Sequence, residues 1–230
     1  MPAPTGDRRI PLSRVQALIA ERMTAAKSTV PEFTVSIDVD AARATALRAD
    51  LNAQGLRPVP SVNDFVVRAA ALALALAEHP RLNARFDAGA LVYHDDVNVG
   101  IAVATEEALH VPVIRRADVL PLTALATESR RLAGAVRDGR ITPQELAGGT
   151  FTVSNLGMFG VSRFTAVINA PQAAILAVGG FDDRARMELT LTCDHRVVYG
   201  AHAAAFLARV RELLENPFTI LVDVPRTQAA

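Results

Sequence analysis

The longest apolar stretch of the 230-residue chain, residues 65–77, constrains the fold more than any other segment. It is rich in Ala and Leu and is interrupted by Arg68. Its length falls short of the roughly 20 apolar residues that a helix needs to span a membrane. Ser61 is a good helix N-cap, and the Pro-Val-Pro sequence at 58–60 breaks the chain before it. We therefore expect a helix at 61–78 that other parts of a globular domain bury on most sides.

Patterns of both helical and strand period flank this segment. Phe33, Val35, Ile37 and Val39 alternate with polar residues, which predicts a half-buried strand. Further helices are predicted at 13–27, 41–51, 121–136 and 201–214, and strand-like runs lie at 91–93, 97–103, 111–114, 150–153, 173–178 and 187–192. Because helices and strands interleave irregularly and no segment repeats, the order favours one domain with a mixed α/β sandwich over a regular βαβ repeat.

The composition excludes several kinds of partner. The chain carries 24 Lys plus Arg against 24 Asp plus Glu, so no net charge attracts a nucleic acid or an anionic membrane surface. Cys193 is the only cysteine, which excludes an internal disulfide framework and a cysteine-based zinc site. The simplest compartment is then the reducing cytoplasm. Arginine supplies 23 of the 24 basic residues, Lys27 being the other, and with the abundant Ala this usage indicates a GC-rich bacterial genome.

The segment 194–200 (Asp-His-Arg-Val-Val-Tyr-Gly) lies between the last predicted strand and the last predicted helix. Side chains at such junctions commonly point into a cleft. His195 is therefore a candidate general base, because histidine has the side-chain pKa closest to neutrality. A surface or capping histidine is the alternative. The other four histidines, at 79, 94, 110 and 202, have no second ligand at metal spacing, so we expect no metal site.

A second candidate lies in the segment 148–160, where Ser154 and Asn155 end a predicted strand before a glycine-rich turn. A serine hydroxyl held there can donate a hydrogen bond to a developing oxyanion, and a turn-stabilising serine is the alternative. The segment lacks the Gly-x-Ser-x-Gly pattern of hydrolases and the Lys-Ser/Thr of a phosphate-binding loop. Cys193 lies two positions before His195, but a small core cysteine fits better than a nucleophile.

Several short motifs occur in a fixed order along the chain. They are RIPLS at 9–13, AERM at 20–23, VPEFT at 30–34, SVNDF at 61–65, YHDDVNVG at 93–100, GTFTVSNLG at 149–157, INAPQAAIL at 168–176 and DHR at 194–196. Together they resemble the catalytic, inner-core domain of the dihydrolipoamide acyltransferases, the E2 components of the 2-oxo acid dehydrogenase complexes. The opening of the chain is a small segment with Pro and Gly, which indicates a linker remnant at 1–8. The resemblance implies an acyltransferase catalytic domain at 9–222 and a C-terminal tail at 223–230.

The resemblance also implies a fold and a set of partners. The fold is that of chloramphenicol acetyltransferase, a two-layer α/β sandwich with a mixed sheet that assembles as a homotrimer. Trimers of this family associate into hollow cubic (24-mer) or icosahedral (60-mer) cores. Coenzyme A and a lipoyl group are the implied substrates, with no metal. The implied protein partners are a lipoyl domain, and E1 and E3 components that bind through family domains absent from this sequence.

Residue roles follow from the same resemblance. The histidine that matches His195 removes the proton from a thiol of coenzyme A or of a dihydrolipoyl arm, and the thiolate attacks the thioester of the other partner. The serine that matches Ser154 hydrogen-bonds the oxyanion across a subunit boundary, and Asn155 and Arg196 support the two. We therefore expect an acyltransferase that moves the acyl group directly between two thiols. The acyl group (acetyl, succinyl or branched) stays open.

The sequence departs from the family pattern at Tyr199, where the motif normally has Asp before Gly200. The lost carboxylate would have paired with an arginine, for which Arg22 is a candidate, so a partial loss of rate is expected. The connection at 180–186 is also shorter than usual. Two alternatives stay open: a catalytically impaired structural paralogue of the core, and a stand-alone acyltransferase that uses coenzyme A with a non-lipoyl acceptor.

Overall fold

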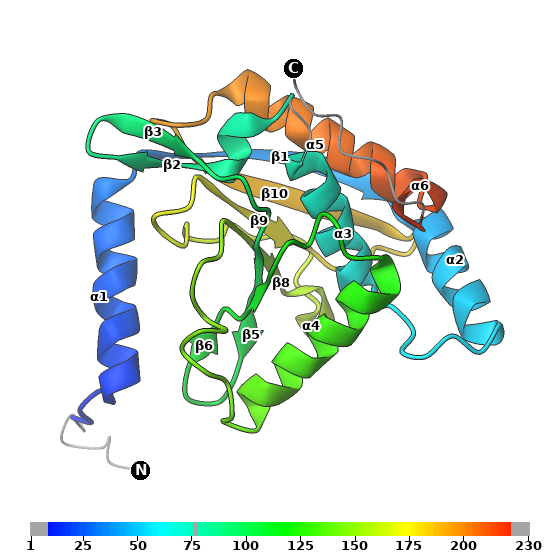
Figure 1. Ribbon diagram of the computed structural model, residues 1–230, viewed down its shortest axis with the longest axis horizontal. Coiled ribbons are helices and arrows are strands. Elements are labelled where there is room, and N and C mark those ends of the chain that lie inside the picture. Colours follow the sequence, from blue (N-terminus) through cyan, green and yellow to red (C-terminus); the bar gives the residue numbers. More distant parts are fainter. Residues whose placement is uncertain (1–8, 76–77, 222–230) are drawn as a thin grey trace, which may run out of the picture.

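A six-stranded mixed sheet forms the centre of the protein, as the computed structural model shows for residues 9–75 and 78–221 (Figure 1). Its strand order is β1 (Glu32–Asp40), β10 (Arg186–Asp194), β9 (Ala174–Val178), β8 (Phe151–Asn155), β4 (Val99–Ile101) and β7 (Val113–Ile114). β8 runs parallel to β4 and β9, whereas β10 pairs antiparallel with β1 and β9, as does β4 with β7. The predicted α/β class with a mixed sheet is confirmed.

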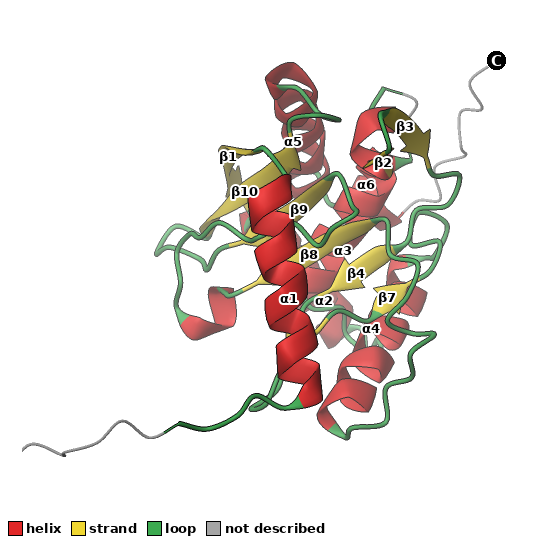
Figure 2. Ribbon diagram, turned by 90° about the vertical axis from the view of Figure 1, so that its left-hand side faces the viewer, coloured by secondary structure: helices red, strands yellow, loops and turns green. Residues whose placement is uncertain are grey.

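The helices pack around α3 (Val62–Leu74). It is in contact with α2 (Ala42–Ala53), α4 (Leu122–Arg137), α5 (Gly200–Glu215) and the short α6 (Phe218–Leu221). By contrast, α1 (Arg14–Thr29) stands apart from this group at the side of the domain (Figures 1 and 2). Ala26 is the residue of α1 that is buried. Most of α1 therefore faces solvent in the isolated protomer.

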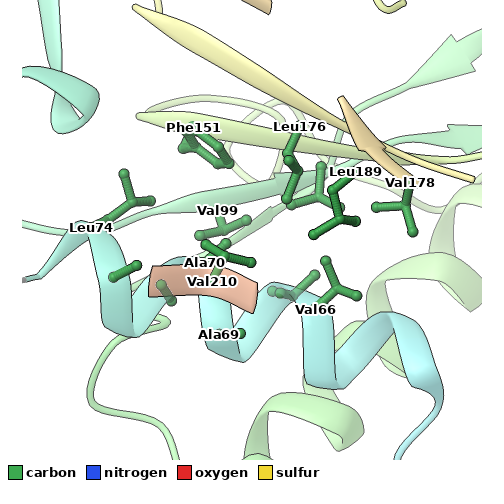
Figure 3. Close-up of a cluster of buried hydrophobic side chains, with 14 of the residues drawn as sticks. Val66, Ala69, Ala70, Leu74, Val99, Phe151, Leu176, Val178, Leu189 and Val210 are labelled. Carbon is green, nitrogen blue, oxygen red and sulfur yellow. The ribbon is translucent and has the colours of Figure 1, made fainter. Parts of the chain in front are cut away.

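Burial of α3 confirms the interpretation of the apolar stretch. Val66, Ala69 and Ala70 on α3 are fully buried, and Val66 lies toward Leu189 and Val178 of the sheet (Figure 3). The predicted cap is also present, because the Ser61 hydroxyl accepts from the Asp64 N–H at 3.2 Å and the Asp64 carboxylate accepts from the Ser61 N–H at 2.7 Å. Within the described residues α3 ends at Leu74, short of the predicted end at Glu78, and His79 has a non-helical backbone before Pro80.

Two of the strand predictions need correction, and one strand was missed. The predicted strand 97–103 is divided, because Val103 leaves the central sheet and pairs with β6 (Leu109–His110) as part of β5 (Val103–Ala104). The predicted strand 111–114 shortens to β7, since Pro112 cannot donate to a ladder. β2 (Ala84–Asp87), which pairs with β3 (Ala90–Tyr93), was not predicted, because its four residues, ARFD, are too few to establish a strand period.

Two further expectations concern the ends of the chain and membranes. The proposed linker remnant at 1–8 and the proposed tail at 223–230 lie outside the described residues. Among residues 9–75 and 78–221, no helix has the length and the apolar character to cross a bilayer.

The backbone of residues 161–162 packs closely against Gly179, at the end of β9 near Ser154. The Gly179 N–H donates to the Glu188 carbonyl at 2.9 Å, and the next N–H, of Gly180, donates to the Val161 carbonyl at 2.8 Å. A Cβ atom on Gly179 would lie 1.8 Å from the Ser162 carbonyl oxygen. Only glycine lets the segment around residue 162 pass this close to β9.

We predict that Gly179→Ala lowers the free energy of unfolding by about 3 kcal/mol, because backbone must move to admit the methyl group. The matched control is Gly134→Ala in α4, where a Cβ atom meets nothing within 4 Å. That change is expected to raise the free energy of unfolding by about 0.5–1 kcal/mol, since alanine favours helix. Denaturant unfolding measures both, and equal stability of the two variants would contradict the prediction.

Candidate active site

The loop after β10 carries His195 and is fixed by its backbone. The His195 N–H donates to the Pro31 carbonyl at 2.9 Å, which continues the pairing of β10 with β1 by one step. The Asp194 carbonyl then accepts from the N–H groups of Val197 at 3.0 Å and Val198 at 2.9 Å. These bonds form a tight turn. The backbone of His195 is therefore fixed at the end of β10, although the residue is exposed to solvent.

The imidazole of His195 lies between two aromatic rings. The ring centroids of His195 and Phe33 are 4.5 Å apart at an interplanar angle of 47°, and those of His195 and Tyr199 are 6.0 Å apart. Phe33 stands on β1, so the strand predicted at 33–39 supplies one wall of the site. The ring is thus packed on its sides while it stays accessible to a substrate.

Asp194 and Arg196 form a forked ion pair beside this loop. The Arg196 Nε lies 3.0 Å from Asp194 Oδ1, and a terminal guanidinium nitrogen lies 2.8 Å from Oδ2. The Asp194 carboxylate is buried, and its hydrogen bonds raise the pKa of Arg196. The guanidinium carbon of Arg196 also lies 4.4 Å from the Phe86 ring centroid, on β2. The pair fastens the start of the loop to the β2–β3 hairpin.

Tyr199 ends the loop and contacts a different arginine from the one that we expected. The Arg81 guanidinium carbon lies 5.2 Å from the Tyr199 ring centroid, and its NH1 donates to the Val197 carbonyl at 2.9 Å. Arg22 instead lies exposed on α1, where it lines a cleft of about 430 Å³ with residues 169–172. Nothing in the sequence around Arg81 marked it as a residue of the site.

Ser154 and Asn155 lie at the C-terminal end of β8, close to the start of α3. Ser154 is partly buried. The Asn155 side chain donates to the Asn63 side-chain oxygen on α3 at 3.1 Å and accepts from the Gly157 N–H at 2.8 Å. Asn155 therefore braces the strand end on which the Ser154 hydroxyl stands.

The sheet register separates the two candidate catalytic residues. Ser154 pairs with Ala177 on β9, and Ala177 pairs with Thr190 on β10. His195 lies five positions beyond Thr190, which corresponds to about 16 Å along the strand and two strand spacings of about 4.8 Å across the sheet. The two Cα atoms are thus about 19 Å apart within one protomer. One protomer cannot bring both side chains to the same carbonyl group.

Cys193 is excluded as a nucleophile. It is fully buried in the core, and burial, aided by the nearby Asp194 charge, raises its pKa to about 12. The thiolate is the reactive form of cysteine. The interpretation as a small core cysteine is confirmed.

Arg57, Arg130, Arg131 and Arg140 line a hollow of about 660 Å³. Arg131 is ion-paired with Glu128 and Glu145, and Arg140 with Asp138, so carboxylates neutralise part of this charge. Arg57 directly precedes Pro58, close to the start of α3, where Asn63 contacts Asn155. Within residues 9–75 and 78–221, no cluster of three or more His, Cys, Asp or Glu side chains could hold a metal ion.

A model of one protein family matches almost the whole chain. It is the family of 2-oxoacid dehydrogenases acyltransferase (catalytic domain), matched at residues 4–222. The chain belongs to this family. A relative from Rickettsia felis, the acetyltransferase component of its pyruvate dehydrogenase complex, is 37% identical over 94% of this chain. The corresponding mitochondrial protein of Schizosaccharomyces pombe is 39% identical over 96% of this chain. The chain spans about half the length of these relatives, 55% and 48%.

Solved acyltransferase structures share the fold over nearly their full length. The dihydrolipoamide acetyltransferase of Azotobacter vinelandii has a TM-score of 0.87 and 30% identity, over 96% of this chain and 100% of that one. A probable dihydrolipoamide acetyltransferase from Listeria monocytogenes has a TM-score of 0.85 and 30% identity, over 98% and 99%. A chloramphenicol acetyltransferase, at 16% identity and a TM-score of 0.55 over 84% and 94%, shares the fold alone.

The Azotobacter acyltransferase bears on the position of Tyr199. Investigations of that protein concerned the roles of a serine, a histidine and an asparagine in its catalytic mechanism, with the asparagine four positions after the histidine. Tyr199 follows His195 by the same spacing. The serine and histidine there are 52 positions apart, whereas Ser154 and His195 are 41 apart, which agrees with the short connection at 180–186. A side chain other than a carboxylate thus occurs at this spacing in a relative.

We predict that iodoacetamide at pH 8 leaves Cys193 of the native protein unmodified. The thiol with its pKa raised to about 12 is almost entirely protonated at that pH, and the core shields it. Unfolding in guanidinium chloride returns the pKa to about 8.5 and should allow complete alkylation, which mass spectrometry detects. Rapid alkylation of the native protein would contradict the assignment of Cys193 to the inert core.

Proposed function

We propose that this chain is an acyltransferase that moves an acyl group between the thiol of coenzyme A and a dihydrolipoyl thiol. His195 is the general base, and Ser154 of a neighbouring protomer stabilises the oxyanion. The observation that carries this proposal is the position of His195. It is an exposed imidazole on a backbone-pinned turn, and its neighbouring cysteine is inert, in a chain of the acyltransferase family.

The chemistry needs a base and an oxyanion donor but no protein nucleophile. The imidazole of His195 takes the proton of one thiol, and the thiolate attacks the carbonyl carbon of the other partner's thioester. The tetrahedral intermediate carries a negative oxygen, to which the Ser154 hydroxyl donates a hydrogen bond. When the intermediate collapses, the second sulfur leaves as a thiolate and takes the proton from the His195 imidazolium. Transfer is direct, so no acyl-enzyme forms.

Completion of the site requires a second protomer. The separation of about 19 Å between Ser154 and His195 within one chain supports a site at a subunit boundary. We propose a homotrimer, in which each of three boundaries pairs His195 of one protomer with Ser154 of the next. A solved relative at 31% identity forms the cubic core of a pyruvate dehydrogenase complex, with a TM-score of 0.87. Association of trimers into a 24-mer or 60-mer core is part of this proposal.

The substrates and partners follow from the same proposal. In the hollow near the start of α3, Arg57 and Arg130 donate to backbone carbonyls, and their charge serves the phosphates of coenzyme A. The lipoyl arm arrives on a lipoyl domain, and the E1 and E3 components of the complex are further partners. The relatives from Rickettsia felis and Schizosaccharomyces pombe are acetyltransferase components, which favours acetyl as the acyl group.

A catalytically impaired scaffold is the alternative that Tyr199 raises. Two observations weigh against it. His195 and Ser154 are both present, and the Azotobacter relative has an asparagine at the spacing where Tyr199 stands. Loss of a carboxylate at this position is therefore compatible with an acetyltransferase.

We predict that His195→Ala lowers kcat by about 10³-fold or more, because the thiol loses its base. Ser154→Ala is expected to lower kcat by about 10²–10³-fold, since one oxyanion donor is lost. The measurement is acyl transfer from acetyl-, succinyl- and isobutyryl-coenzyme A to dihydrolipoamide. His110→Ala, a histidine change on β6, is the matched control and should keep the wild-type rate.

One outcome would establish the scaffold instead. The wild-type protein would show no transfer from any of the three donors, and Tyr199→Asp would create the activity. Normal acyl transfer from an acyl-coenzyme A to a different acceptor, with no response to dihydrolipoamide, would favour the non-lipoyl alternative.

A further inference from the structure

Arg81 joins the loop of His195 to a rigid part of the domain. It lies on a short 3₁₀ helix, Pro80–Asn83, that follows α3. Leu82 of this turn is fully buried, and the side chain of Asn83 donates to the carbonyls of His94 at 3.0 Å and Asp96 at 3.1 Å. The base of Arg81 is therefore fixed both by the core and by the chain that follows β3.

The guanidinium of Arg81 makes two contacts with the catalytic loop. One is the hydrogen bond of 2.9 Å to the carbonyl of Val197, and the other is the position of its central carbon 5.2 Å from the ring centroid of Tyr199. A cation over an aromatic face is attracted by the negative centre of the ring. Arg81 thus holds the loop at a backbone atom and at a side chain two residues farther on.

Tyr199 passes this restraint on to His195. Its ring lies 6.0 Å from the His195 ring and 5.5 Å from that of His202, and its N–H donates to Nδ1 of His202 at 3.3 Å. On its other side the imidazole packs against Phe33, at 4.5 Å. The ring of His195 is consequently confined between β1 and a tyrosine that Arg81 holds in place.

We infer that Arg81 is a positioning residue for His195, acting through the ring of Tyr199 and the carbonyl of Val197. This inference rests on the proposed function. It also explains how a chain without the usual motif carboxylate keeps its loop in place. An aromatic ring binds an arginine through its face, so the phenol does not need the negative charge that a carboxylate would bring.

The test is a set of variants in the assay of acyl transfer from acetyl-coenzyme A to dihydrolipoamide. Arg81→Ala and Tyr199→Ala should each lower kcat about tenfold or more, with the KM values for acetyl-coenzyme A and dihydrolipoamide unchanged within about twofold, because misplacement of the base affects chemistry and not substrate binding. The loss in the double variant should be smaller than the product of the two single losses, since both changes remove the contact between Arg81 and Tyr199, whereas the hydrogen bond to Val197 is lost only with Arg81.

Conservative variants separate positioning from folding. Tyr199→Phe keeps the ring face and should keep kcat within about twofold of wild type, and Arg81→Lys keeps a cation over the ring and should recover part of the loss. Arg85→Ala is the matched control. Arg85 lies four positions after Arg81 in the sequence, and its NH2 contacts the Asp87 carboxylate at 3.0 Å and not the His195 loop. Its kcat should equal that of the wild type.

Three results would overturn the inference while the proposed function stands: an unchanged kcat in Arg81→Ala, a rise in KM alone, or losses that multiply in the double variant. Loss of kcat in Tyr199→Phe equal to that in Tyr199→Ala would also overturn it, because the hydroxyl and not the ring would then be the active part. A wild-type protein without any acyl transfer would overturn the proposed function and this inference together.

Discussion

The hydrogen-bond register of β8, β9 and β10 is the constraint on which the rest of the site depends. β9 is parallel to β8 and antiparallel to β10. The C-terminal end of β8, which carries Ser154, and the C-terminal end of β10, which precedes His195, therefore lie at opposite ends of the strands. Both side chains stand where strands end, which gives each access to a substrate. The same register keeps Ser154 and His195 of one chain too far apart to act on one substrate. Catalysis therefore requires that protomers assemble.

Local interactions then fix each half of the site separately. At one edge, Asn155 ties the strand end of Ser154 to Asn63 on α3. At the other, the Asp194–Arg196 pair and the bond from His195 to Pro31 fix the start of the loop. The contact of Arg81 with Tyr199 closes the end of that loop. Each half is rigid before the protomers meet, which lowers the entropic cost of forming the complete site.

Much of the fold could be predicted from the sequence because it is locally encoded. The cap at Ser61, the buried helix after it and the alternating strand from Phe33 to Val39 all appear in the structure near their expected positions. β2 was missed because four alternating residues are too few to mark a strand, and it forms through pairing with β3. The predicted strand at 97–103 was too long, since only tertiary pairing decides where Val103 leaves the sheet.

His195 and Ser154 were found from motifs. Arg81 was not, because its role comes from a contact with a residue far along the chain. The distance between Ser154 and His195 could not be predicted from the sequence either, because strand direction and register are set by long-range pairing.

The central claim, that one active site takes His195 and Ser154 from different protomers, is tested most directly by mixing two inactive variants. His195→Ala and Ser154→Ala protomers, co-expressed in equal amounts, assemble at random into trimers in which about one boundary in four joins an intact His195 to an intact Ser154. The acyl-transfer rate of the mixture should therefore reach about a quarter of the wild-type rate, far above that of either variant alone. A mixture no more active than its two components would contradict the claim, because it would mean that each site lies within a single protomer.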